Sequence, residues 1–124
     1  MGFTKTVVEV ANAERPDLKA DVELLVGSGA SYSVVAEDFL RRLQVRPLEE
    51  REFTLANGER IRRKVGGVRV RVGERMGFCS VIFGEMHDQP VLGVTALEEL
   101  GLELDPTTKQ LRPAELFLLG SIKS

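Results

Sequence analysis

The stretch Leu25-Val26-Gly27-Ser28-Gly29-Ala30-Ser31 decides how this 124-residue sequence is interpreted. The residues before it, 21–26, alternate so that Val22, Leu24 and Val26 share one face, which predicts a strand. A short helix is predicted soon after it, around residues 36–43. Because small residues let a backbone turn sharply and approach a neighbour closely, the stretch predicts a tight loop between these two elements.

Antiparallel β-structure is predicted on both sides of this loop. Asn57-Gly58 stands between alternating segments, and this dipeptide is the strongest short-range signal of a β-hairpin. Gly66-Gly67 opens a strictly alternating run with one apolar face and one arginine face. The remaining strands are predicted at 3–10, 68–72 and 78–83, with turns at 12–16 and 73–75.

The last third of the chain predicts one more helix. Thr95 and Glu98 fit a capping box with Thr95 as N-cap, and Gly101 stands where a C′ glycine ends such a helix. A short strand at 102–104 follows. The tail then carries four apolar residues, Leu116–Leu119. Since such a run is costly in water, we expect it to dock on the chain's own core or on another subunit.

The composition is that of one globular domain spanning residues 1–124, with 43% apolar and 29% charged residues. The net charge of −2 and the pI near 5.5 predict no nucleic-acid partner. No apolar stretch reaches the roughly 18 residues of a membrane span, so no membrane association is predicted. We expect a cytoplasmic protein, because one cysteine cannot form an intrachain disulfide and the start lacks a signal peptide's apolar core.

Cys79 and His87 are the only cysteine and the only histidine. A Cys–His nucleophile would need a third group to orient the pair, and the sequence offers none. One cysteine and one histidine also fall short of the three or four ligands of an ordinary metal site. No metal and no other cofactor is therefore predicted.

Two functional interpretations compete for the small-residue loop. Gly27-x-Gly29 after a strand is how a dinucleotide-binding loop begins. The position of the third glycine is Tyr32, however, and hairpin signals follow where a dinucleotide domain would continue as alternating strands and helices. A nucleotide-binding domain is therefore the less favoured alternative.

The other interpretation is a family resemblance. Val26–Ser31 resembles the Asp-Thr/Ser-Gly-Ala-Ser signature of retropepsin-like (retroviral-type) aspartic peptidases, with Gly27 in place of the aspartate. Val91-Leu92-Gly93 resembles the family's apolar-apolar-Gly motif, which crosses behind the catalytic loop. The order of the helices and hairpins also follows the family. The resemblance covers about residues 21–112, and residues 113–124 form a C-terminal tail that a dimer interface could hold.

The resemblance implies an all-β fold, a retropepsin-like closed β-barrel with one or two short helices, paired as a homodimer. Active relatives hydrolyse peptide bonds with two aspartates, one from each subunit, that together activate a water. Carried over residue by residue, Gly27 holds the position of the catalytic aspartate, while Ser28 and Gly29 keep their family roles. The implied substrate-binding positions are Ala30 in the loop and Ala56, Asn57 and Gly58 in the flap, the hairpin that closes over the peptide.

Gly27 has no side chain that could hold a proton, so the resemblance predicts an inactive member of the family, either a natural pseudoenzyme or an inactivated variant. No nearby acid replaces it, because Asp21 lies six residues back along an extended strand and Glu37 and Asp38 lie on the predicted helix. A single change, Gly27→Asp, is expected to restore the acid. The alternative function is that of a non-catalytic peptide-binding or dimerisation module.

Overall fold

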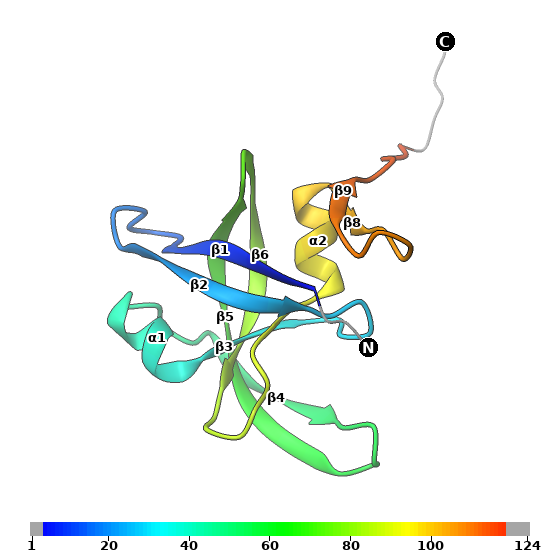
Figure 1. Ribbon diagram of the computed structural model, residues 1–124. Helices are drawn as coiled ribbons and strands as arrows, with labels where there is room; N and C mark the ends of the chain where they lie inside the picture. The colour runs from blue at the N-terminus through cyan, green and yellow to red at the C-terminus, as the bar shows by residue number, and fades with distance from the viewer. Residues whose placement is uncertain (1–3, 119–124) are drawn as a thin grey trace.

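The computed structural model describes residues 4–118, in which nine strands and two helices follow one another (Figure 1). The strands dominate and both helices are short, as the sequence predicts. Their bounds are β1 Lys5–Asn12, β2 Lys19–Val26, β3 Ser33–Ala36, α1 Glu37–Arg42, β4 Glu49–Thr54, β5 Arg60–Val72, β6 Arg75–Gly84, β7 Val91–Leu92, α2 Val94–Leu100, β8 Leu102–Leu104 and β9 Leu111–Pro113.

Seven of these strands form one sheet in the order β1-β2-β7-β3-β6-β5-β4, and an additional pairing of β1 with β5 closes it. The 13-residue strand β5 makes the closure possible. Its first half pairs with β4, its second half pairs with β6, and residues 68–71 also pair with β1. The predicted closed all-β barrel is thus confirmed. The predicted strand opening at Gly66-Gly67 is corrected, because β5 runs unbroken through that pair.

Alternating β-branched residues fill the barrel, because one face of each strand points inward. Helix α2 packs beside β6 at one end of the barrel, where Gly77 leaves room for it. A Cβ at Gly77 would lie only 3.1 Å from the carbonyl oxygen of Glu99. The most deeply buried side chains are Val8, Val10, Leu24, Leu40, Val68, Val81 and Leu92.

A buried asparagine ties the β1–β2 turn to the end of α1. The side-chain amide of Asn12 donates to the carbonyl oxygens of Leu43 and Gln44, both at 3.0 Å. Its oxygen accepts from the backbone N–H groups of Glu14 and Arg15 at 2.9 and 3.1 Å. All the hydrogen-bonding capacity of this side chain is used, although the sequence indicated only a turn here.

The predicted turn and helix-end glycines are confirmed. Gly58 in the β4–β5 turn has φ 89°, and Gly101 after α2 has φ 68°, a left-handed conformation that favours glycine.

The predicted capping box is wrong. Helix α2 begins at Val94 with Gly93 as its N-cap, and the hydroxyl of Thr95 donates instead to the carbonyl oxygen of Ser31, 2.8 Å away. A tertiary contact to the small-residue loop has replaced the local cap.

The apolar tail does not bury itself on the chain's own core within the described residues. The exposed fractions of Leu116, Phe117 and Leu118 are 69%, 81% and 95%, whereas Leu119 lies outside residues 4–118. The chain's own core, one of the two docking places expected for the tail, therefore does not bury these three side chains.

We expect Asn12→Ala to lower the free energy of unfolding by about 2–3 kcal/mol, because the N–H of Glu14 and the carbonyl oxygens of Leu43 and Gln44 lose their partner, whereas the N–H of Arg15 keeps the carbonyl oxygen of Asn12. Urea denaturation followed by circular dichroism measures the change. Ser80→Ala, on the exposed side of β6, serves as the control and should change stability by less than about 0.5 kcal/mol. Equal stabilities for the two variants would contradict the structural role of Asn12.

Candidate active site

The loop between β2 and β3 is a tight turn held by backbone hydrogen bonds. The N–H of Ala30 donates to the carbonyl oxygen of Gly27 at 3.0 Å, and the N–H of Gly27 donates to the carbonyl oxygen of Leu92 at 3.0 Å. Ser28 and Gly29 are exposed at the tip. A Cβ at Gly29 would meet no atom within 4 Å, so the tip faces open space in the single chain.

Strand β7 lies directly behind this loop. It pairs in parallel with β2 through Leu25–Val91 and Val26–Leu92, and antiparallel with β3 through Val34–Val91. The N–H of Val94 then donates to the carbonyl oxygen of Ala30 at 2.7 Å. The segment Val91–Gly93 therefore supports the loop from behind, in the position that the resemblance predicted.

Gly93 is required by this close approach. A Cβ at this position would lie 2.5 Å from the backbone carbon of Tyr32 and 2.6 Å from its carbonyl oxygen. The N–H of Gly93 also donates to the hydroxyl of Ser33, a buried side chain, at 2.9 Å. Any residue larger than glycine would push the loop away from β7.

Gly27 is also tightly enclosed, but by a side chain. A Cβ at Gly27 would lie 2.4 Å from Cγ2 of Val91 and 3.4 Å from Cβ of Ala30. The backbone of Gly27 is not in the left-handed region, so its conformation does not require glycine. The methyl group of Val91 alone excludes a side chain here, and Gly27→Asp needs a movement of Val91 that the sequence could not reveal.

The acids considered from the sequence do not approach the loop as substitutes. Asp21 is exposed near the far end of β2. The pKa of Glu37 is held below its ordinary value, first by a hydrogen bond from Lys64 and then by the charges of Lys64 and Arg41. Glu37 is therefore an ion-pair partner of the flap stem and of its own helix, at 3.1 Å from Lys64 and 2.9 Å from Arg41.

A pocket of about 380 Å³ beside Ser28 was not predicted. Its walls come from α2, from β8 and from the start of the tail, and they are mainly apolar. Three glutamates also line it, of which Glu103 is ion-paired with Arg112. The lining residues are Ser28, Val94, Leu97, Glu98, Leu102, Glu103, Leu104, Ala114, Glu115 and Leu116.

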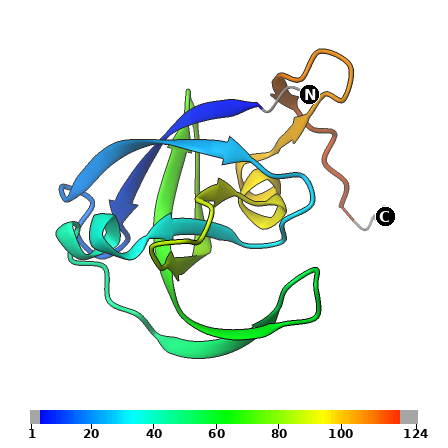
Figure 2. The same ribbon diagram turned by 60° about the horizontal axis from the view of Figure 1, so that its bottom comes forward.

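The predicted flap is present as the β4–β5 hairpin. Ala56, Asn57 and Gly58 form its exposed tip, closed by a hydrogen bond from the N–H of Leu55 to the carbonyl oxygen of Glu59 at 2.8 Å. In Figure 2 this tip lies on the same side of the barrel as the β2–β3 loop, which it faces across a gap. Within residues 4–118, no hydrogen bond joins the tip to the loop.

Tyr32 connects the loop to the flap, and sequence reasoning noted it only as a missing glycine. Its ring makes an edge-to-face contact with Phe53 of β4, with centroids 5.6 Å apart and planes at 80°. Its hydroxyl accepts a hydrogen bond from Arg51 at 3.1 Å. The sequence signal that could have pointed to Tyr32 is its place directly after the run of small residues 27–31.

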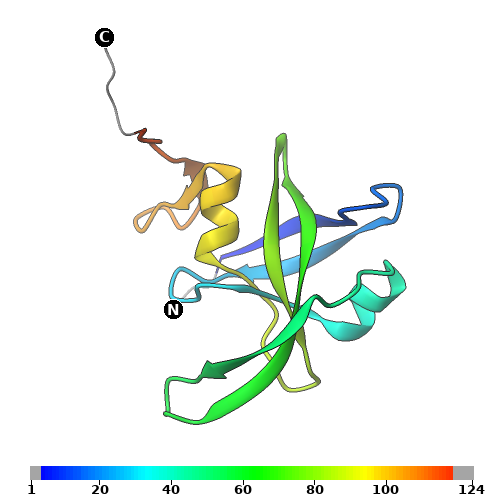
Figure 3. The same ribbon diagram turned by 180° about the vertical axis from the view of Figure 1, so that it is seen from behind.

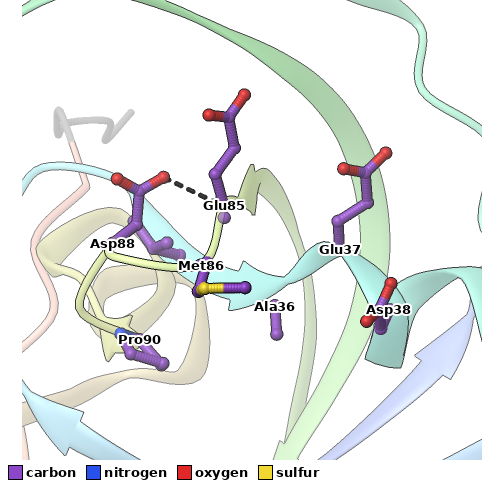
Figure 4. Close-up of a pocket in the computed structure, with 9 residues that line it drawn as sticks. Ala36, Glu37, Asp38, Glu85, Met86, Asp88 and Pro90 are labelled. Carbon is purple, nitrogen blue, oxygen red and sulfur yellow. Dashed lines mark hydrogen bonds between the residues drawn. The ribbon is translucent and has the colours of Figure 1, made fainter.

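A second pocket, of about 460 Å³, lies between α1 and the loop before β7 (Figure 4). Four acidic side chains line it, and all four have a basic partner, with Asp38 at 3.5 Å from Arg41 and Glu85 at 3.6 Å from Arg63 as the longer pairs. Arg63 donates to both carboxylate oxygens of Asp88, at 2.7 and 3.0 Å, and Lys64 pairs with Glu37. The pKa of Asp88 is lowered, mainly by the bond from Arg63. Among residues 4–118, no group of acids, histidines or cysteines is arranged to hold a metal.

Cys79 lies in the middle of β6 and packs against the core. Burial, followed by the nearby charge of Glu99, raises the pKa of its thiol to about 11. The thiol therefore stays protonated at neutral pH, which disfavours it as a nucleophile. His87 is exposed in the loop after β6.

The comparisons with known proteins agree with this geometry. A family model described as aspartyl protease matches residues 6–96. Among solved structures, the EIAV protease complexed with the inhibitor HBY-793 is similar over 94% of both chains, with 18% sequence identity and a TM-score of 0.65. No curated protein matches the sequence. No helix within residues 4–118 is long and apolar enough to cross a membrane.

The order of the fold also disfavours a dinucleotide loop, because β3 and a one-and-a-half-turn helix follow Gly27 where a βαβ unit would need a long helix. The family match spans the barrel from β1 into α2 and includes both the loop and the segment that supports it. The chain therefore belongs to the aspartyl protease family and has the retropepsin-like form of its fold.

Proposed function

We propose that this chain forms a homodimer that binds peptides between its β2–β3 loops and its flaps without hydrolysing them. The observation that carries the proposal is the environment of Gly27. This position has no side chain, and the methyl group of Val91 occupies the space that a side chain would need.

The chemistry of the family explains the absence of hydrolysis. Two carboxylates in close contact share one proton, so that one can accept a proton from water while the other donates to the scissile carbonyl. In a two-fold symmetric dimer both acids come from the same position, and glycine removes both together. Ser28, Gly29 and Ala30 keep the turn, but none of them titrates near neutral pH.

Features of the single chain support a dimer. The loop tip at Ser28 and Gly29 faces open space, and an apolar pocket lies beside it. The tail next to that pocket exposes three large apolar side chains in succession, 116–118. Burying one such side chain contributes about 1.5–3 kcal/mol. A second copy placed across a two-fold axis would cover the loop, the pocket and the tail at once.

A pure dimerisation module is the second candidate, because the exposed tail and the open loop tip favour it equally. The flap distinguishes the two. A hairpin held over the loop has no purpose in a module that only dimerises, whereas a peptide-binding domain needs it to cover the ligand. Incubation with a random peptide library, followed by mass spectrometry of the retained and the cleaved peptides, tests both. Retention without cleavage supports the proposal, and no retention supports the dimerisation module.

We expect the unmodified chain to cleave no peptide, and Gly27→Asp combined with Val91→Ala to gain activity with a bell-shaped, acid-leaning pH profile. The second substitution makes room for the carboxylate, and the two limbs of the profile belong to the coupled pair. Gly27→Asn with Val91→Ala is the matched control, which has the same bulk but no acid and should stay inactive. Cleavage by the unmodified chain would show that another acid serves.

The steric conflict at Gly27 should be measurable as a change in the free energy of unfolding, without an activity assay. We expect Gly27→Ala to lower the free energy of unfolding by about 1–3 kcal/mol, because the new methyl meets Val91. In a Val91→Ala background the same substitution should cost clearly less, which a double-mutant cycle in urea measures. Gly67→Ala, at an exposed position of β5, is the control, since its Cβ meets no atom within 4 Å and it lies outside the β2–β3 loop. Additive effects of the substitutions at 27 and 91 would refute the conflict.

The tail should carry part of the dimer affinity. We expect Leu116→Ser with Phe117→Ser to raise the dimer dissociation constant at least tenfold, because each tenfold step needs only about 1.4 kcal/mol. Analytical ultracentrifugation over a concentration series measures it. Met86→Ser removes an apolar side chain that is 89% exposed elsewhere and should leave the constant unchanged. An unmodified chain that sediments as a monomer at high micromolar concentration would contradict the proposal.

A further inference from the structure

One face of the β4–β5 hairpin carries the side chains that contact Tyr32 and Asp88, whereas Lys64 on the other face pairs with Glu37 of α1. Arg51 pairs directly with Arg63 across the two strands, and Phe53 pairs with Ile61. Directly opposed residues, and residues two apart along a strand, point to the same face. On this inner face Phe53, Ile61 and Arg63 are partly buried, while the alternate residues Glu50, Glu52, Arg60 and Arg62 are exposed.

The stem of the hairpin is fixed by a strong contact. The guanidinium of Arg63 donates to both oxygens of Asp88, and the exposed fractions of these side chains are only 15% and 22%. Asp88 also accepts a hydrogen bond from the N–H of Glu85 at 2.7 Å, which closes the loop before β7. A bidentate, partly buried arginine–carboxylate pair is among the stronger polar contacts in proteins.

The contact nearer the tip is weaker. Arg51, whose side chain is 45% exposed, donates a single hydrogen bond to the hydroxyl of Tyr32 at 3.1 Å. It also pairs with Glu49 on its own strand. Phe53 adds the edge-to-face contact with the Tyr32 ring. An exposed arginine contact contributes little by itself, and an aromatic pair about 0.5–1.5 kcal/mol.

The backbone of Tyr32 is firmly held although its side chain reaches outward. Gly93 packs against its carbonyl group, and the N–H of Thr95 donates to the carbonyl oxygen of Ser31 just before it, at 3.0 Å. The Tyr32 side chain therefore projects from a rigid base toward the hairpin. Among residues 4–118, the other ion pairs that tie this hairpin to the rest of the chain are those of Arg63 and Lys64.

We propose that Tyr32 is a latch that holds the flap in its closed position, with the Arg63–Asp88 pair as the fixed pivot. When the flap opens, the contacts of Tyr32 with Arg51 and Phe53 break, while the stem stays bound to Asp88. Tyr32 is a positioning residue, because it acts on the place of the flap and not on reacting atoms. The role of the latch in admitting a peptide rests on the proposed function, but the latch itself does not.

The sequence supplies a direct probe, because Tyr32 is the only tyrosine and the chain has no tryptophan. Incorporation of 3-fluorotyrosine gives a single ¹⁹F resonance from the latch, and acrylamide quenching of tyrosine fluorescence reports the exposure of the same ring. We expect Arg51→Gln, and more strongly Phe53→Ala, to move the resonance toward that of free fluorotyrosine and to raise the quenching constant. The open population should rise several-fold, and at most about tenfold for the aromatic contact.

Glu52→Gln, on the outer face of the same strand, is the matched control and should change neither signal. Arg51→Gln alters one exposed side chain and should leave the fold intact, so it keeps the test informative if Phe53→Ala unfolds. Signals identical to the unmodified chain in a folded Arg51→Gln and a folded Phe53→Ala protein would overturn the latch. If the ¹⁹F resonance and the quenching constant change as expected but the protein retains no library peptide, the proposed peptide binding is refuted and the latch is not.

Discussion

The close approach of Gly93 to the backbone of Tyr32 is the constraint on which the rest of the structure depends. It brings β7 between β2 and β3, so that a strand of only two residues joins the two sides of the small-residue loop. The hydrogen bonds from Gly27 to Leu92 and from Val94 to Ala30 can form only at this separation. Helix α2 begins at the same point, which is why its first turn bonds to the loop and not to its own cap.

This arrangement separates the framework of the site from its chemistry. The turn is held by backbone groups and by the buried hydroxyl of Ser33, and none of these contacts involves a side chain at position 27. The barrel, the loop and the β4–β5 hairpin are therefore held in place without any side chain at position 27. The fold and the family match therefore do not depend on which side chain stands at position 27.

Local signals predicted those parts of the fold that depend on neighbouring residues. Gly58 and Gly101 adopt positive φ angles, as their positions in the hairpin turn and at the helix end indicated, and the strands follow the apolar alternation. The features that were predicted wrongly or missed are those in which a residue contacts a segment far away in the sequence. Thr95 contacts Ser31, 64 residues away, and Asn12 contacts Leu43, 31 residues away. The link from Tyr32 to Phe53 and the overlap of position 27 with Val91 likewise depend on tertiary packing, which spacing along the chain does not encode.

The packing of Val91 against Gly27 also affects how the chain can change over time. A single base change converts a glycine codon into an aspartate codon, so an aspartate at position 27 is easily reached by mutation. The structure makes that mutation unfavourable as long as the valine methyl remains within 2.4 Å of the new Cβ. A residue with a side chain at position 27 must therefore be accompanied by a shift or a substitution of Val91. Val91 thus acts as an evolutionary constraint on position 27, because its methyl group disfavours a direct change from glycine to a larger residue.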